Sequence, residues 1–230
     1  MLRINESVWR RRKLEFWDRL WEDLEIGYLD EDLLPVLIYF YIDRGTHTLS
    51  SCSGRIILAD STFPWSREET SVVYKKHSPV DTSEIAGIID KTPVRRLWLN
   101  VTGPIIHVST TSMDIADKIL AIARNAGMKH SGILSISENK GIILELTTGV
   151  KLTHLLRCKD ELITDISKLD KLVEVANQVL YEGKRILCRL FVELRENMPF
   201  TPDETIIKDL RRRGLTLEKL FPPSYCRELL

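Results

Sequence analysis

The chain has 230 residues, of which 43% are hydrophobic and 29% charged, proportions typical of a globular protein with a sizeable core and too apolar for a disordered chain. Its 33 Lys and Arg residues balance its 33 Asp and Glu residues. The zero net charge excludes a protein that binds nucleic acid through its overall charge, although it is compatible with a local basic site.

Neither a membrane segment nor a secretory signal is expected. The longest apolar stretch, 33–42, contains Pro35 and is too short to span a bilayer. The first residues lack the apolar core and the cleavage site of a signal peptide. The four cysteines lie far apart without a Cys-x-x-Cys pair, so neither a disulfide framework nor a zinc knot is predicted. We therefore expect a cytoplasmic protein.

Helices and strands follow one another along the chain. Apolar residues from Trp17 to Leu24 share one helix face, which predicts a helix over 7–25. Acidic residues at 30–32 start a second helix over about 31–43, which Gly45 ends and a short link follows. In chain order, the pattern then predicts strands over 55–59 and 70–75, a helix over 83–90, strands over 95–101 and 105–109, a helix over 111–127, strands over 133–137, 141–147 and 150–155, and a long helix over 167–197.

These elements predict an α+β fold, in which a mixed or antiparallel sheet is covered by helices. We expect one domain over 1–197 with a helical N-terminus over 1–45, and a C-terminal helical tail over 198–230 packed on it. A helix, a short link, a Ser-Gly pair and a strand occur twice, which favours two duplicated halves whose Ser-Gly turns face one cleft. No Gly-x-Gly occurs, so a Rossmann nucleotide-binding fingerprint is absent.

The segment 48–55, Thr-Leu-Ser-Ser-Cys-Ser-Gly-Arg, is the most unusual part of the sequence. Its hydroxyl groups and backbone N–H groups could bind a carboxylate or phosphate, which Arg55 could contact in a bidentate manner. A plain Ser- and Gly-rich loop is the alternative interpretation. Cys52 as a nucleophile would need a neighbouring base, and the sequence indicates none.

The five histidines do not have the spacing of a metal site, so no bound metal is expected. His77 follows two lysines at a predicted strand end, and His130 follows Lys129 and precedes a Ser-Gly pair. The lysines could contact phosphates, and either histidine could transfer a proton. Solvated loop charge is the alternative for both clusters.

Together these segments resemble the tRNA wybutosine-synthesizing protein 3 family over about residues 30–195. The matching motifs are 51–56 with Ser50 before it and Asp60 after it, His77 at a strand end, Pro-x-x-His-Val over 104–108, Gly-Met-Lys-His-Ser-Gly-Ile over 127–133, and Thr-Thr-Gly over 147–149. The chain has Lys129 and His130 where the family has Arg and Asn, and Glu145 where an Arg is common. The full set of matches suggests an archaeal member.

The resemblance implies methyl transfer from S-adenosylmethionine to N4 of the tricyclic 4-demethylwyosine-type base at position 37 in the anticodon loop of tRNA(Phe), without a Rossmann methyltransferase domain. On that basis we predict that His77 or His130 accepts the proton. We predict cofactor or phosphate binding by Ser51, Ser53, Gly54, Arg55, Asp60, Ser131 and Gly132, and RNA contacts by Lys75, Lys76, His107 and Lys129. An extruded base would stack on Tyr74 or Trp98. A non-enzymatic RNA-binding module and a small-molecule regulatory domain stay open as alternatives.

Overall fold

The structure is a computed structural model that describes residues 4–66, 68–198, 201–220 and 226. The chain forms two compact units, and each consists of several chain segments. The first unit comprises Met1–Ser53, Pro104–Gly149 and Arg185–Leu230, and the second comprises Gly54–Gly103 and Val150–Lys184. Within the described ranges, none of the helices combines the length and the hydropathy that crossing a bilayer requires.

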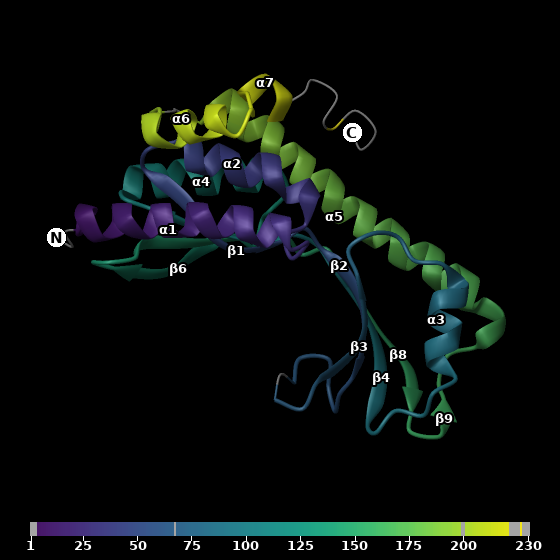
Figure 1. Cartoon of the computed structure of the whole chain (residues 1–230). Helices are drawn as coiled ribbons and strands as arrows, with labels where there is room; N and C mark the ends of the chain where they lie inside the picture. The colour runs from purple at the N-terminus through teal and green to yellow at the C-terminus, as the bar shows by residue number, and fades with distance from the viewer. Residues whose placement is uncertain (1–3, 67, 199–200, 221–225, 227–230) are drawn as a thin grey trace. The chain divides into compact units, whose positions relative to one another are not determined.

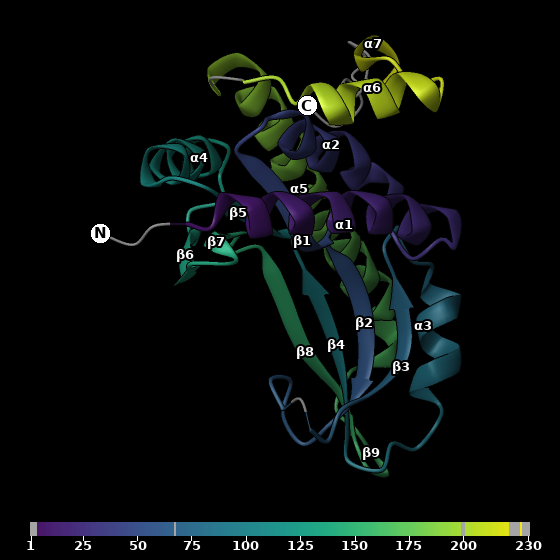
Figure 2. The same cartoon turned by 60° about the vertical axis from the view of Figure 1, so that its left-hand side comes forward.

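The first unit is built on a four-stranded antiparallel sheet in the order β1-β5-β7-β6. Its strands are β1 (Thr46–Cys52), β5 (Ile105–Thr110), β6 (Gly132–Ser137) and β7 (Gly141–Thr147). Its helices are α1 (Glu6–Glu25), η1 (Glu31–Leu33), α2 (Leu34–Ile42), α4 (Met113–Asn125), the second part of α5 (Leu169–Asn197), α6 (Glu204–Arg212) and α7 (Leu217–Leu220). Figures 1 and 2 both show α2, α4 and α6 on the same side of this sheet.

The core of the first unit follows from the apolar patterning of its helices. Every residue of α2 from Pro35 to Ile42 is buried, as expected of a helix that is hydrophobic all round. Helix α1 buries Trp9 and Trp17 on one face, and Trp9 Nε1 donates a hydrogen bond to the Ser109 hydroxyl of β5 at 2.7 Å. Helix α1 is thereby fixed to the sheet.

The segment after α5 packs on the first unit through a buried ion cluster. Asp203, the N-cap of α6, accepts hydrogen bonds from Arg10 at 2.7 Å and from Lys13 at 2.9 Å. Lys13 is completely buried and Asp203 is 2% exposed. Burial lowers the pKa of Lys13 to about 8, and its hydrogen bond to Asp203 opposes that shift. Burial alone would raise the pKa of Asp203, but the two cations hold it at about 2. Helix α6 is therefore attached to α1 by charge as well as by apolar packing.

A disulfide joins Cys188 of α5 to Cys226, a pairing that the sequence analysis, which expected no disulfide framework, did not predict. The pair was missed because the two residues are separated by 38 positions and no motif links them. The partners come together only because the tail returns to α5.

We expect Cys226→Ser to lower the free energy of unfolding by about 2–4 kcal/mol, because the bridge closes a loop long enough to restrict the unfolded chain. Chemical denaturation of oxidised wild type and variant measures this difference. Cys158→Ser, which lies outside the disulfide, is the matched control and should leave stability unchanged. Four titratable thiols in unfolded, non-reduced wild type would contradict the bridge.

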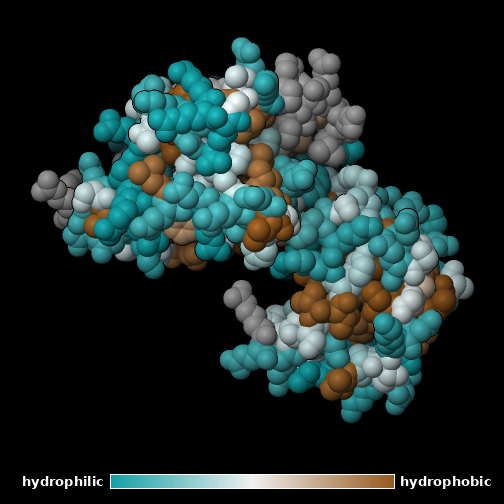
Figure 3. Space-filling view, in the orientation of Figure 1, coloured by the Kyte–Doolittle hydropathy of each residue, from teal (hydrophilic) through white to brown (hydrophobic). Residues whose placement is uncertain are grey.

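The second unit has a five-stranded antiparallel sheet in the order β3-β2-β4-β8-β9. Its elements are β2 (Arg55–Asp60), β3 (Ser71–Lys76), α3 (Thr82–Ile89), β4 (Arg96–Thr102), β8 (Lys151–Cys158), β9 (Glu161–Leu162), η2 (Ile166–Lys168) and the first part of α5. Alternating residues of β2 and β4 pack against α3 and α5 in one apolar cluster. The Asn177 side chain of α5 exchanges two hydrogen bonds with the backbone of Val80, both at 2.9 Å. Hydrophobic residues also gather on the surface of this unit (Figure 3).

The predicted α+β class with antiparallel sheets is confirmed, and each predicted helix and strand is present within a few residues of its expected bounds. The link expected after the second helix is wrong, because 46–52 forms strand β1. The two Ser-Gly repeats lead into strands of different sheets, β2 and β6. The predicted single domain over 1–197 contains segments of both compact units, and the tail over 198–230 falls in the first.

Candidate active site

Four sequence motifs meet at one end of the sheet in the first unit. Strands β1 and β7 end there at Cys52 and Thr147, and strands β5 and β6 begin there at Ile105 and Gly132. Because neighbouring strands are antiparallel, the end of one strand lies beside the beginning of the next. The register pairs Cys52 with Ile105, and Ile105 with Thr147. Segments far apart in the sequence therefore become neighbours.

A hydrogen-bonded row of three side chains crosses this end of the sheet. The Ser50 hydroxyl lies 2.6 Å from Nδ1 of His107, and Nε2 of the same ring lies 3.0 Å from a carboxylate oxygen of Glu145. His107 and Glu145 are opposite each other in the register of β5 and β7, so their side chains leave the sheet on the same face. The row is accessible to a ligand, because Ser50 is exposed and the side chains of His107 and Glu145 are 21% and 35% exposed.

The two partners of the imidazole fix its tautomer. An ionised carboxylate can only accept, so Nε2 of His107 carries a proton and donates to Glu145. In the neutral ring Nδ1 is then the acceptor for the Ser50 hydroxyl. Glu145 orients the ring and the ring polarises the hydroxyl. The row can therefore take up a proton at Ser50 and hold it on His107.

A bulge in β1 aims Ser50 at this row. Thr48 pairs with Val108 whereas Ser51 pairs with Ile106, so β1 has one residue more than β5 between the two pairs. The buried Tyr41 hydroxyl donates a hydrogen bond to the Thr48 carbonyl at 3.0 Å and holds the strand at this point. Burial raises the pKa of that hydroxyl, so Tyr41 stays protonated and a donor.

A cavity of about 310 Å³ adjoins Ser50 and Ser51. Its volume lies at the lower end of the range for small-molecule sites. It is lined by aromatic, aliphatic and charged side chains of α1, α2 and the loop between them, together with β1: Phe16, Arg19, Leu20, Asp23, Tyr28, Leu29, Leu37, Tyr41 and 48–51. Aromatic rings beside hydroxyl and carboxylate groups are suited to a planar, partly polar ligand.

The motifs at 127–133 and 147–149 hold each other in place. The Ser131 hydroxyl accepts from the Thr147 backbone N–H at 3.1 Å and donates to the Met128 carbonyl at 2.7 Å, so it joins the two motifs. The His130 ring lies against Gly149, since a Cβ atom at Gly149 would lie 2.7 Å from Nε2 of His130. His130 therefore lies beside the end of β7 with its side chain exposed.

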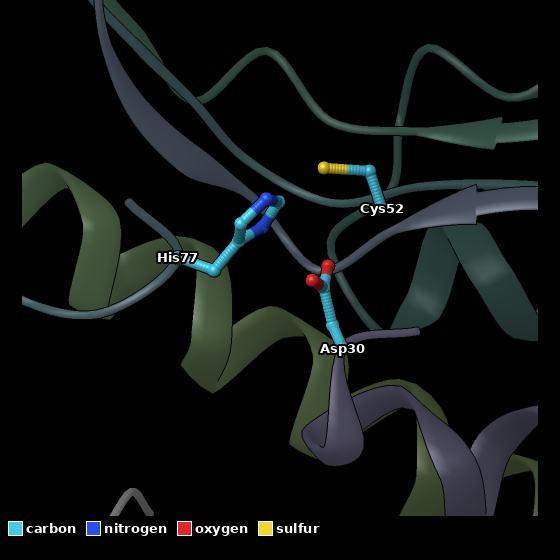
Figure 4. A group of neighbouring side chains, drawn as sticks. All are labelled: Asp30, Cys52 and His77. Carbon is cyan, nitrogen blue, oxygen red and sulfur yellow. The ribbon is translucent and has the colours of Figure 1, made fainter. Parts of the chain in front are cut away.

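Hydrogen bonds anchor the backbone of both Ser53 and Gly54, near the end of the 48–55 segment. In the first unit, the backbone N–H of buried Ser53 donates to the Asp30 carboxylate at 2.9 Å. In the second unit, the Gly54 carbonyl accepts from Nδ1 of His77 at 3.1 Å. Figure 4 draws the side chains of Asp30, Cys52 and His77. Since Nδ1 is the donor, Nε2 is the basic nitrogen of the neutral His77 ring.

Gly54 cannot be replaced without strain. Its φ is +99°, and a Cβ atom would lie 2.7 Å from the Thr102 carbonyl oxygen. The next residue, Arg55, has a buried Nε without a hydrogen-bond partner among the described residues. An unpaired buried donor costs about 1–3 kcal/mol, a cost that an anionic ligand would offset. This feature agrees with the anion-binding role predicted for Arg55.

The structure does not bring Asp60 to the other candidates. It lies at the far end of β2, where its carboxylate accepts from the backbone N–H groups of Val94 at 2.6 Å and Arg95 at 2.9 Å. Lys76 forms an ion pair with Glu84 at 2.9 Å, whereas Lys75 is exposed. Lys75 is thus better placed than Lys76 to contact RNA.

Both predicted stacking residues are half-buried and hydrogen-bonded within the second unit. Tyr74 donates to Glu84 at 2.9 Å, and Trp98 Nε1 donates to the Ser61 carbonyl at 3.2 Å. The Asp81 backbone N–H, Lys76 and Tyr74 hold the pKa of Glu84 at about 2. Desolvation and this carboxylate raise the pKa of Tyr74 to about 12.

A comparison with known protein families identifies the family of this chain. A family model described as "Methyltransferase TYW3" matches residues 11–196. The chain belongs to this methyltransferase family. The match covers α1, both sheets and α5, and so includes every motif described above.

Curated members of the family are similar over most of this chain. A protein from Saccharolobus solfataricus is 42% identical over 77% of this chain and 85% of its own length, and one from Aeropyrum pernix is 34% identical over 72% and 87%. Both are named tRNA(Phe) 7-((3-amino-3-carboxypropyl)-4-demethylwyosine(37)-N(4))-methyltransferase. A solved structure of a Pyrococcus horikoshii protein matches with a TM-score of 0.77 and 31% identity, covering 82% of this chain and 97% of that one.

Sequence reasoning missed two members of the site. Asp30 was interpreted only as the start of a helix, and Glu145 only as a departure from the family pattern. Alternation along β7 could have placed Glu145 on the exposed face of the sheet. Its pairing with His107 depends on strand order and register, which a single sequence does not reveal.

Proposed function

We propose that this protein transfers a methyl group from S-adenosylmethionine to N4 of the 4-demethylwyosine-type base at position 37 of tRNA(Phe). Membership of the methyltransferase family and the printed names of relatives as much as 42% identical support this function. The observation that carries it is the Ser50–His107–Glu145 row beside a ligand-sized cavity. The cytoplasmic location stays a prediction.

The row would remove the proton that the reaction releases. When N4 forms a bond to the methyl carbon and the carbon–sulfur bond breaks, its electron pair goes to sulfur and N4 must lose one proton. Ser50 accepts that proton while its own hydroxyl proton passes to Nδ1 of His107. Glu145 stabilises the imidazolium that results, because its carboxylate is already bonded to Nε2.

The residues around the cavity fit S-adenosylmethionine, which when bound would supply a methyl group on a positively charged sulfur. Phe16 and Tyr28 offer ring faces for a purine, and Asp23 and the Ser51 hydroxyl offer hydrogen-bond acceptors. Since the methyl group is already activated, the protein needs mainly to place it in line with the attacking nitrogen.

His107, which the sequence analysis predicted to contact RNA, is here assigned to proton transfer, and several of the other candidates keep their proposed roles. Exposed Lys129 and Lys75 would contact phosphates of the anticodon loop, and Arg55 would bind an anionic group of the cofactor or the RNA. His77 and His130 are further candidates for the proton acceptor, to be separated from His107 by mutation.

Labelled S-adenosylmethionine tests the function directly. The protein is incubated with tRNA(Phe) carrying the unmethylated tricyclic base, and tRNA(Phe) with plain guanosine at position 37 is the control. We expect label in the tricyclic base only. Tight binding of the first tRNA without label transfer, in the presence of intact donor, would instead favour a non-enzymatic RNA-binding module.

A further inference from the structure

The loop between β2 and β3 in the second unit presents two stacked aromatic side chains to solvent. The rings of Phe63 and Trp65 are 5.1 Å apart between centroids and 6° from parallel. Phe63 is 43% exposed and Trp65 is 75% exposed. Figures 1 and 2 show that this loop stands clear of the other ribbons of its own unit. Two large aromatic side chains thus remain in water although the unit has an apolar core nearby.

The base of the loop is rigid. The Ser61 backbone N–H donates to Arg96 at 3.0 Å, the Ser61 hydroxyl donates to the Phe63 carbonyl at 2.9 Å, and the Ser66 N–H donates to the same carbonyl at 3.0 Å. A guanidinium N–H of Arg96 also donates to the Thr62 carbonyl. These bonds fix Phe63 in position before any ligand binds, so binding would lose little conformational entropy.

Arginine and the two rings form a short series. The guanidinium of Arg96 lies over the Phe63 ring, 5.3 Å from its centroid, and Phe63 stacks on Trp65. Trp65 is therefore the outermost ring of the series Arg96–Phe63–Trp65, which agrees with its greater exposure. A third planar ring could extend the stack on Trp65.

Two arginines next to the loop offer positive charge to a phosphate. Arg96 begins β4 and lies over Phe63, and Arg95 precedes it; Glu69 neutralises Arg95 in part at 3.6 Å, and the loop also carries the exposed Glu68. Unpaired nucleotides combine a planar base with a phosphate, the two groups that an aromatic ring and an arginine bind.

We propose that Phe63 and Trp65 form a stacking surface for an unpaired nucleotide of the tRNA, separate from the Ser50–His107–Glu145 row. The choice of tRNA rests on the proposed function. Trp65 stacks with the base, and Arg96 holds Phe63 behind it and contributes positive charge toward the phosphates.

The test compares Trp65→Ala, Trp65→Phe and Val94→Ala with wild type, using a tRNA(Phe) transcript as the probe and measuring Kd by fluorescence anisotropy at several salt concentrations. Val94, 76% exposed in the same unit, is the matched control. We expect Trp65→Ala to raise Kd by about 5- to 150-fold, because stacking contributes about that factor for each base. Trp65→Phe, which keeps a ring, should lose much less, and Val94→Ala should bind as wild type does. The slope of log Kd against log salt should stay unchanged in Trp65→Ala, because no phosphate contact is lost.

The outcomes separate this surface from the proposed reaction. Unchanged tRNA affinity in Trp65→Ala, with label transfer by wild type intact, overturns the stacking surface and leaves the methyltransferase proposal standing. Weakened binding by Trp65→Ala, in a protein whose wild type transfers no label, supports the surface and overturns the reaction. A circular dichroism melting curve checks that Trp65→Ala folds. If it does not, the transcript should quench more tryptophan fluorescence in wild type than in Trp65→Phe, because only wild type carries Trp65, and equal quenching in the two proteins would overturn the stacking surface.

Discussion

Replacing His107 by alanine is expected to reduce the rate of methyl transfer at saturating substrates by about 10²- to 10⁴-fold, the usual loss when a general base is removed. Ser50 would then lose the acceptor at 2.6 Å that takes its hydroxyl proton. The effect should appear in kcat rather than in tRNA affinity, because the row acts on the proton and not on the binding of the RNA. Single-turnover label transfer measures it without interference from product release.

Four comparison variants make this result specific. Ser50→Ala should cost a similar factor, because it removes the group that contacts N4. Glu145→Gln should cost less, since the amide can accept through its oxygen but does not stabilise an imidazolium. His77→Ala and His130→Ala retain the row and should transfer label faster than His107→Ala. A His107→Ala rate within threefold of wild type would remove His107 from the catalytic residues.

Replacing Asp203 by asparagine is expected to lower the free energy of unfolding by about 3–5 kcal/mol, the usual cost of leaving one member of a buried ion pair without its partner. Lys13 would remain fully buried with its charge uncompensated. Urea denaturation measures the loss. The double variant Lys13→Met/Asp203→Leu removes both charges and should recover much of the stability, whereas an equal loss in both variants would contradict the ion-pair explanation.

The Arg10–Lys13–Asp203 cluster also predicts that the free energy of unfolding falls at acidic pH. The pKa of Asp203 in the folded state is about 2, below the ordinary value near 3.9 for an unfolded chain. Its contribution to stability is therefore complete above the ordinary value and is lost as the pH falls toward 2. Asp203→Asn should lack this part of the acid transition.

Local patterns predicted most of the elements, and long-range pairing explains what they missed. The apolar spacing of α1 and the strand alternation of β4 and β5 were sufficient because each element buries one face. Strand β1 was missed because its sequence, Thr-His-Thr-Leu-Ser-Ser-Cys, lacks that alternation and is extended by pairing with β5. Tertiary pairing thus overrides weak local preference.

In the candidate site, too, local sequence predicted some features and long-range strand pairing determined the others. The 48–55 segment and the histidines were recognisable by residue type, and the motif resemblance added their function. The sequence did not indicate which histidine has a partner on each ring nitrogen. His107 has that property, and it requires three strands in register.

The division of α5 between the two compact units has a consequence for synthesis of the protein. The segment from Arg185 onward supplies core residues to a unit that begins near the N-terminus. The ribosome must therefore release nearly the whole chain before that unit can be complete, and no single contiguous gene fragment encodes either unit. The first unit should consequently complete its folding after the second, and recombination cannot transfer one unit to another protein by a single exchange.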